Sequence, residues 1–196
     1  MALAVTVLLG AGFLWWSTDE LRAFTTEGAR RLAVSQQPRA LPVVRLEDQG
    51  GNSFGFQDYR GQYLVVEFIY SRCPTLCTTL GQSFQRIAGG MAPGRLGRDL
   101  SLLSISFDSL HDDTEALRGY AERFGADGRG WRVARLSDPG QLAPLLRTFG
   151  VVVVPDDMGG FEHNAALHVV DPAGRLSQIY DYRAANQVIA DLGGRR

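Results

Sequence analysis

The chain has only two cysteines, and their spacing and placement favour chemistry. Cys73 and Cys77 lie four positions apart. They follow an apolar run at 63–70 that is typical of a buried strand, and the segment 76–91 predicts a helix. A helix N-terminus favours thiolate over thiol, and the thiolate is both the nucleophile and the metal ligand. The pattern therefore indicates either a redox site or a site for a soft metal ion.

The distance between the two thiols leaves both kinds of site open. On a helix, residues four apart share a face, with Cα atoms about 6 Å apart. This distance is near the upper end of the range that a disulfide accepts, and it also leaves room for an ion between the sulfurs. Two thiolates suit Cu(I) and also zinc. A purely structural disulfide is the alternative, although closing so short a loop gains little chain entropy.

The elements around the cysteines alternate between strands and helices. The segment 41–56 predicts a hairpin with a Gly-rich turn. After it, periodicity and turn residues predict further strands at 100–107, 131–136, 165–170 and 176–182, and helices at 114–124, 138–149 and 184–192. This order is typical of a thioredoxin-like α/β sandwich with an N-terminal hairpin, and we expect that fold for residues 39–196.

One of the three histidines is placed to reach the thiols. His163 is expected in a loop just before the strand 165–170, and in a thioredoxin-like sheet that loop lies against the cysteine turn. Two thiolates and one imidazole make a trigonal soft-metal site. A surface position is the alternative for a loop histidine. His168 lies five residues further on and therefore faces the other side of the sheet, as a structural histidine.

Carboxylates near the end of the strand 100–107 form a second group of candidates. Asp108 ends this strand at the same sheet edge as the cysteines. It is a candidate for an outer-shell acceptor or a weak oxygen ligand, and the alternative is a turn residue. His111, Asp112 and Asp113 could bind a hard cation, but capping of the next helix is the favoured interpretation. Met91 is expected to be a packing residue, as is Met158.

Length and charge place the chain among single-domain proteins. It has 196 residues and a formal net charge of -1. That length fits one domain with an appendage. A balanced charge without a basic face argues against a nucleic-acid partner.

The N-terminus is a separate hydrophobic segment. Residues 2–16 are apolar, small or Thr, and the run ends in two tryptophans, as at a bilayer interface. A signal-anchor, a cleaved signal peptide and a buried helix are all compatible with this run, which is short for a membrane span. We expect residues 1–17 to be an anchor or signal segment, 18–38 a tether, and the domain to lie outside the cytoplasm.

Three segments resemble the Sco/SenC family of copper-binding proteins for cytochrome oxidase assembly. They are 67–77 with its Cys-Pro-x-x-Cys motif, the Asp block at 104–117, and Glu162-His163-Asn164 with the turn that follows strand 165–170. The resemblance covers roughly residues 42–190. Thr78 and Ser109 replace prolines common in the family, and the Asp block has one extra residue.

The resemblance implies a site, a cofactor and a partner. It makes Cys73, Cys77 and His163 the copper ligands, for Cu(I) or Cu(II), with Asp108 as an outer-shell position. It implies a domain anchored to the inner membrane and facing the periplasm, which loads or reduces the copper centre of cytochrome c oxidase subunit II or another acceptor. The leading hypothesis is a copper metallochaperone. The alternatives are a thiol–disulfide reductase that keeps acceptor cysteines reduced, and a sensor or scaffold without transfer.

Overall fold

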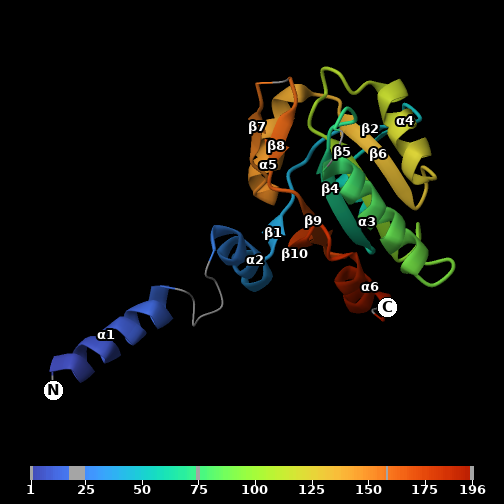
Figure 1. Ribbon diagram of the computed structural model, residues 1–196. Helices are drawn as coiled ribbons and strands as arrows, with labels where there is room; N and C mark the ends of the chain where they lie inside the picture. Colours follow the sequence, from blue (N-terminus) through green and yellow to red (C-terminus); the bar gives the residue numbers. More distant parts are fainter. Residues whose placement is uncertain (1, 18–24, 74–75, 158, 195–196) are drawn as a thin grey trace.

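A central mixed sheet organises the molecule. The computed structural model describes residues 2–17, 25–73, 76–157 and 159–194. Eight strands pair in the order β1-β10-β9-β4-β5-β6-β2-β3, with β7 and β8 forming a separate hairpin (Figure 1). The strands are β1 (Arg39–Ala40), β2 (Leu46–Asp48), β3 (Ser53–Phe54), β4 (Tyr63–Ile69), β5 (Leu100–Ser106), β6 (Trp131–Leu136), β7 (Val153–Pro155), β8 (Phe161–His163), β9 (Ala166–Val170) and β10 (Arg175–Asp181).

The helices have bounds close to those expected from periodicity. They are α1 (Ala2–Ser17), α2 (Thr26–Gln36), η1 (Phe56–Tyr59), α3 (Leu76–Gly90), α4 (Thr114–Phe124), η2 (Pro139–Gln141), α5 (Leu142–Phe149) and α6 (Ala185–Gly193). Asp113 caps α4 by accepting hydrogen bonds from the backbone N–H groups of Glu115 and Ala116, which confirms the capping interpretation. Gly150 ends α5 with φ 67°, a left-handed conformation that glycine adopts without strain.

The centre of the sheet delivers the cysteines. Strand β4 is parallel to β5 and antiparallel to β9, and β4 is buried from Leu64 to its end. A strand buried on both faces reads as a continuous apolar run, which is why the sequence pattern of 63–70 located it. The chain leaves the carboxyl end of β4 directly into the cysteine segment, and α3 begins at Leu76.

Two expectations for connecting segments need correction. The N-terminal hairpin is shorter than predicted, because only β2 and β3 pair across its Gly-rich turn. The segment before His163 was expected to be a loop, but Val153 pairs with His163 and Pro155 with Phe161 to form the β7–β8 hairpin. Proline and glycine in this segment obscured the strand pattern. Met158 lies outside the described residues.

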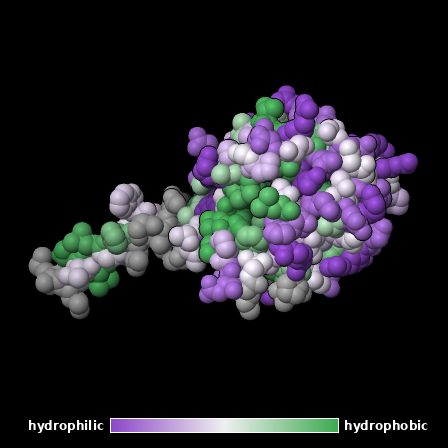
Figure 2. All heavy atoms as spheres, turned by 90° about the horizontal axis from the view of Figure 1, so that it is seen from above, coloured by the Kyte–Doolittle hydropathy of each residue, from purple (hydrophilic) through white to green (hydrophobic). Residues whose placement is uncertain are grey.

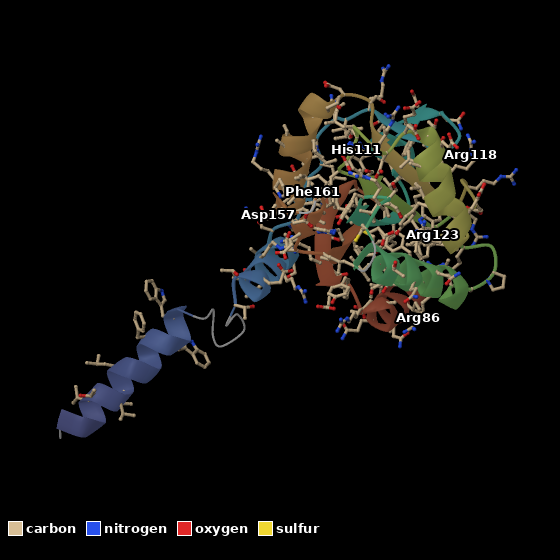
Figure 3. The ribbon with its side chains drawn as sticks, turned by 45° about the horizontal axis from the view of Figure 1, so that its top comes forward. Arg86, His111, Arg118, Arg123, Asp157 and Phe161 are labelled. Carbon is tan, nitrogen blue, oxygen red and sulfur yellow. The ribbon has the colours of Figure 1, made fainter. Side chains whose placement is uncertain are left out.

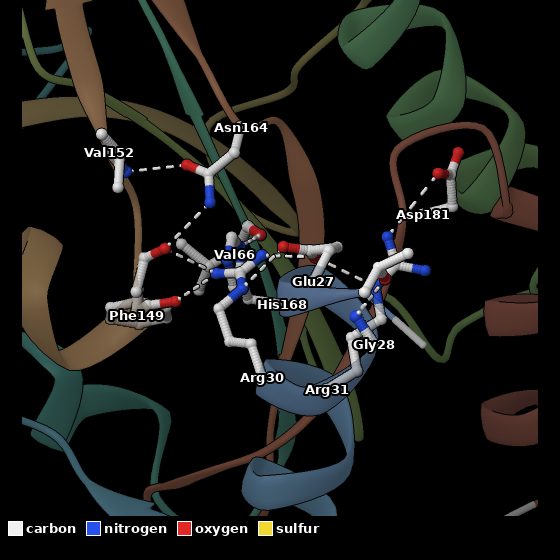
Figure 4. Close-up of polar contacts among 12 residues, drawn as sticks. Glu27, Gly28, Arg30, Arg31, Val66, Phe149, Val152, Asn164, His168 and Asp181 are labelled. Atoms are coloured by element: carbon white, nitrogen blue, oxygen red, sulfur yellow. Dashed lines mark hydrogen bonds and ion pairs between the residues drawn. The ribbon is translucent and has the colours of Figure 1, made fainter. Parts of the chain in front are cut away.

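The segment 18–38 was expected to be a tether, and its described part is docked on the domain. Val34 of α2 is fully buried. Arg30 donates hydrogen bonds to the carbonyl oxygens of Phe149 and Gly150, at 2.7 and 2.8 Å (Figure 4). These carbonyls end α5, where a cation is favourable. Helix α2 is therefore part of the packed structure and not only a spacer.

Helix α1 stands apart from the rest of the chain in Figure 1. Its side chains expose apolar surface, visible in Figure 2, including Leu8 at 72 % and Trp16 at 80 %. It has 16 residues. Among the described residues, no helix combines the length and the apolar character needed to cross a membrane. The anchor or signal role of residues 1–17 stays a prediction.

Candidate metal centre

The two cysteines are adjacent, reduced and buried at the carboxyl end of β4. Both are free thiols, with 5 % of Cys73 and 1 % of Cys77 exposed. The backbone N–H of Cys77 donates to Cys73 Sγ at 3.3 Å. The hydrogen bond with Cys73 and burial both raise the pKa of the Cys77 thiol. The helix terminus was expected to favour thiolate, but here these two effects outweigh it. Cys77 is therefore a neutral thiol until a metal or an oxidant removes its proton.

A fully buried carboxylate fixes the loop before the cysteines. Asp112 accepts hydrogen bonds from the backbone N–H of Ser71 at 2.8 Å and from the Ser71 and Ser106 hydroxyls, both at 2.5 Å. Ser106 ends β5, so these bonds tie residues 71–73, here called the cysteine loop, to the neighbouring central strand. Sequence reasoning placed Asp112 with the cap and missed this role, because no local pattern links positions 71 and 112.

Asp108 supports the same loop through Arg72. Its two carboxylate oxygens contact the Arg72 guanidinium at 2.9 Å and His111 Nδ1 at 2.8 Å. Burial alone would raise the pKa of Asp108, but the hydrogen bonds from Arg72 and His111 outweigh it and lower the pKa. Asp108 is therefore an ionised carboxylate with both oxygens engaged. This geometry fits a supporting residue better than a direct oxygen ligand.

His163 offers a neutral imidazole. It lies at the end of β8, and its ring packs against Phe107 with 5.2 Å between ring centroids. Both ring nitrogens are buried and have no hydrogen-bond partner. Burial lowers the pKa of His163 to about 4. A neutral imidazole with a free lone pair is the form that binds metal, and a buried polar group without a partner calls for an explanation.

The structure brings the two thiols together but does not group His163 with them. Within the described ranges, no three His, Cys, Asp or Glu side chains are grouped closely enough to hold a metal ion. His163 instead borders a surface cavity of about 500 Å³ together with Leu76, the residue before Cys77. The imidazole therefore lies beside the start of α3, on a different element from the thiols. The three-ligand set stays a prediction.

Tyr70 links the thiols to the histidine strand, and sequence reasoning missed it. It follows β4 and is 5 % exposed, and burial, with a smaller contribution from the nearby Cys73, raises the pKa of its hydroxyl. The same hydroxyl lies 3.3 Å from the backbone nitrogen of Phe161 and 3.4 Å from its carbonyl oxygen. The Tyr70 ring packs on Phe107 and Phe161 at 5.5 and 5.3 Å. Its place three residues before Cys73 was the only signal in the sequence.

A second buried acid lies near the first turn of α3. Glu67 is fully buried. Its Oε1 accepts hydrogen bonds from the Ser104 hydroxyl at 2.6 Å and from the Tyr120 hydroxyl at 3.3 Å. Its Oε2 is buried and has no hydrogen-bond partner. The Tyr120 hydroxyl also lies 3.2 Å from the Cys77 carbonyl oxygen. Burial raises the pKa of Glu67 to about 8. Glu67 is therefore protonated at neutral pH, in the electrostatic field of Cys77.

The other histidines have structural or surface positions. His168 is 1 % exposed, its Nδ1 lies 3.2 Å from the Val66 carbonyl oxygen, and burial lowers its pKa to about 3. The interpretation of His168 as a core residue is confirmed. His111 exposes 54 % of its side chain and is bound to Asp108. Figure 3 shows His111 near the top of the folded domain and Arg86 at its lower edge.

The fold and the paired thiols define the class of protein, a thioredoxin-like domain with a cysteine pair at the start of a helix. The family model SCO1/SenC matches residues 35–192, and the chain belongs to this family. A Stutzerimonas stutzeri protein described as copper-binding is 26 % identical over 142 residues, which cover 70 % of this chain and 67 % of the relative. The family prediction and the thioredoxin-like fold are thereby confirmed.

Solved structures share the fold at low sequence identity. Copper-bound ScoI of Bradyrhizobium japonicum has a TM-score of 0.63 and 22 % identity, covering 78 % of this chain and 98 % of that one. BsSco, described as a cytochrome c oxidase assembly protein with a disulfide switch, has a TM-score of 0.68 and 17 % identity, covering 80 % and 92 %. At these identities the likeness shows the fold alone, and the ligands have to be argued from this chain's own residues.

Proposed function

We propose that this protein binds one copper ion through Cys73, Cys77 and His163 and passes it to a copper acceptor during cytochrome c oxidase assembly. The observation that carries the proposal is a pair of buried, reduced thiols at the carboxyl end of β4, with a neutral imidazole near the start of α3 whose two ring nitrogens have no partner. Soft thiolates select Cu(I), and a third nitrogen ligand completes a trigonal site. The copper named for the relatives supports this choice over zinc.

Transfer follows from the way the ligands are held. Binding replaces each S–H bond with an S–Cu bond and releases the proton to solvent, so affinity falls as pH falls. Cys73 lies on the fixed cysteine loop and Cys77 lies in the first turn of α3, whereas His163 lies on a hairpin outside the main sheet. A ligand on a separate element can leave first and open a coordination position for an incoming thiol. The copper centre of oxidase subunit II is the proposed acceptor.

The location of the protein is part of the same proposal. A periplasmic domain held at the inner membrane would face the copper acceptor. The apolar residues exposed on α1 support an interaction of that segment with lipid. Asp108 is proposed as the outer-shell residue that holds Arg72 and, through it, the cysteine loop.

The test is an anaerobic Cu(I) titration of the reduced full chain against a competing chelator. We expect one Cu(I) per chain, loss of tight binding in Cys73→Ser and Cys77→Ser, and a drop of orders of magnitude in His163→Ala. His111→Ala is the matched control, because it removes an exposed histidine that is not a proposed ligand and should keep wild-type affinity. Tight stoichiometric binding in all of these variants would contradict the proposal.

Thiol–disulfide reduction is the second candidate, favoured by the reduced cysteine pair. A reductase needs both cysteines but has no need of His163. Weak copper binding that does not respond to His163→Ala, together with His163-independent reduction of a disulfide substrate, would favour the reductase. The two activities also share a requirement, since copper loading needs reduced thiols.

A further inference from the structure

The two-stranded sheet that carries His163 is joined at its base by the Asn164 side chain. Asn164 accepts a hydrogen bond from the Val152 N–H at 2.7 Å and donates one to the Gly150 carbonyl oxygen at 3.0 Å. Residues Gly150, Val152 and Asn164 are here called the hairpin root. His163 pairs with Val153 directly above this root. The position of the root therefore sets the position from which the imidazole can move.

Arg30 of α2 holds the same root through a backbone oxygen. Its Nη1 donates hydrogen bonds to the carbonyl oxygens of Phe149 at 2.7 Å and Gly150 at 2.8 Å (Figure 4). The Gly150 carbonyl thus accepts from Arg30 and from Asn164, which uses both of its lone pairs. Glu27 orients the guanidinium, because its carboxylate accepts from Arg30 Nε at 2.9 Å and from Nη2 at 2.7 Å.

The contact between α2 and the hairpin root has a rigid element on each side. Phe149, at the end of α5, is fully buried, and its ring packs on the Phe68 ring of β4 with 5.1 Å between centroids. Val34 is fully buried and docks α2 on the domain. The first residue of α2, Thr26, borders the same surface cavity as His163. Helix α2 is therefore a fixed support close to the imidazole.

We propose that Arg30 is a positioning residue for His163 and that it acts through the Gly150 carbonyl and Asn164. A ligand on a small separate sheet loses conformational freedom when it binds a metal, and this loss opposes binding. The contact with Arg30 restricts the hairpin root beforehand, so less freedom is lost when the imidazole joins the thiols. This inference rests on the proposed function. It adds α2, the helix that follows the apolar N-terminal segment, to the elements that determine copper affinity.

The experiment is a double-mutant cycle in the reduced full chain, measured by Cu(I) titration against competing chelators. Arg30→Met keeps an unbranched side chain but removes the hydrogen bonds. We expect Cu(I) affinity to fall about tenfold, as for other residues that support a metal ligand. In a His163→Ala background, measured with a weaker chelator, the same substitution should change affinity little, because the ligand that Arg30 positions is absent. A general loss of structure would lower affinity equally in both backgrounds.

The His163 ring gives a second measurement that needs no metal. It packs against Phe107 with 5.2 Å between centroids, so the Phe107 ring current shifts its proton NMR signals. In Arg30→Met, a looser root should move these signals toward those of an unpacked histidine. The signals of His111, which exposes 54 % of its side chain, should stay in place. Unchanged His163 signals in Arg30→Met would overturn the positioning role.

A matched control and a second variant complete the test. Arg39→Met removes an arginine that donates at 3.3 Å to the Thr148 carbonyl, within α5 and before the root, and should bind Cu(I) as the wild type does. Asn164→Ala removes the other donor to the carbonyl that Arg30 binds, and should lose affinity only when His163 is present. If Arg30→Met does not fold, the Asn164→Ala cycle decides.

The outcomes separate this inference from the proposed function. Equal losses of affinity in the two backgrounds would overturn the positioning role of Arg30 and leave the proposed function standing. An affinity of Arg30→Met at or above that of the wild type would do the same. A wild type that does not bind Cu(I), or that binds it equally well after His163→Ala, would overturn the proposed function and the positioning role together.

Discussion

The cysteine loop and the β7–β8 hairpin meet at one site but are held in opposite ways. The loop follows β4, and Ser71 and Arg72 donate three hydrogen bonds from it to Asp112 and Asp108, while Asp112 also accepts one from Ser106 of β5. The hairpin forms a separate two-stranded sheet with Val154 53 % exposed. Segments with few buried contacts open at low free energy. The comparison teaches that Cys73 is tied to the central sheet, whereas the imidazole is carried by a small separate sheet that can open more readily.

The largest expected effect comes from a substitution that weakens the attachment of the cysteine loop to β5. Asp112→Asn replaces two carboxylate acceptors with an amide, which cannot accept all the hydrogen bonds from Ser71 and Ser106. We expect a loss of about 3 kcal/mol in the free energy of unfolding, because charged buried acceptors are costly to disrupt. Chemical denaturation measures it, and the Cu(I) titration should show weaker binding.

Asp113→Asn is the matched control for this variant. It removes a carboxylate from the neighbouring position, but asparagine caps a helix about as well as aspartate does, so stability and copper binding should stay near wild type. Equal stability of the two variants would mean that Asp112 does not hold the cysteine loop.

The next effect tests whether the carboxyl group of Glu67 is buried and protonated in the folded chain. The pKa of Glu67 is about 8 in the folded chain and near 4.3 when unfolded. Only the unfolded state ionises between these values, so the contribution of Glu67 to stability is complete below pH 4 and falls as pH rises toward 8. From pH 6 to pH 8 the wild type should lose up to about 2 kcal/mol relative to Glu67→Gln. If the difference in unfolding free energy between the wild type and Glu67→Gln does not change with pH, the Glu67 carboxyl is not buried as the structure indicates.

Local patterns predicted the framework of the fold, and long-range contacts produced most of the site. The bounds of α4 and β6 agree with the expected 114–124 and 131–136, because periodicity and capping are local signals. The hairpin was missed because its strands are short and contain Pro155. The roles of Tyr70 and Asp112 depend on partners 91 and 41 positions away, which no spacing in the sequence reveals.

The candidate metal ligands also differ in how far local sequence predicts their placement. The two cysteines are four positions apart at the junction of the cysteine loop and α3, so their adjacency could be predicted from the sequence. The placement of His163 beside the start of α3 could be expected only from the fold. That the structure does not group His163 with the thiols could not be foreseen, because the position of the hairpin depends on its packing against Tyr70 and Phe107.

A smaller effect tests how α2 is held against the end of α5. Arg30→Met removes both hydrogen bonds to the end of α5 and should cost about 1–2 kcal/mol of stability. Arg31→Met is the control. Arg31 makes partly exposed ion pairs with Glu27 at 3.0 Å and with Asp181 at 3.6 Å. Such pairs contribute less than about 1 kcal/mol to stability. If the two variants unfold at the same denaturant concentration, the α5 carbonyls do not hold α2.

The smallest effect sharpens the difference between loop and hairpin. The Asn164 side chain accepts from the Val152 N–H at 2.7 Å and donates at 3.0 Å to the Gly150 carbonyl that also binds Arg30 (Figure 4). Asn164→Ala removes both bonds at a partly exposed position, so we expect a loss of about 1 kcal/mol or less. Hydrogen exchange should speed up in β7 and β8 and stay unchanged in the cysteine loop. Equal acceleration in both would mean that the two regions open together, and the separation between a fixed dithiol and an adjustable imidazole would not hold.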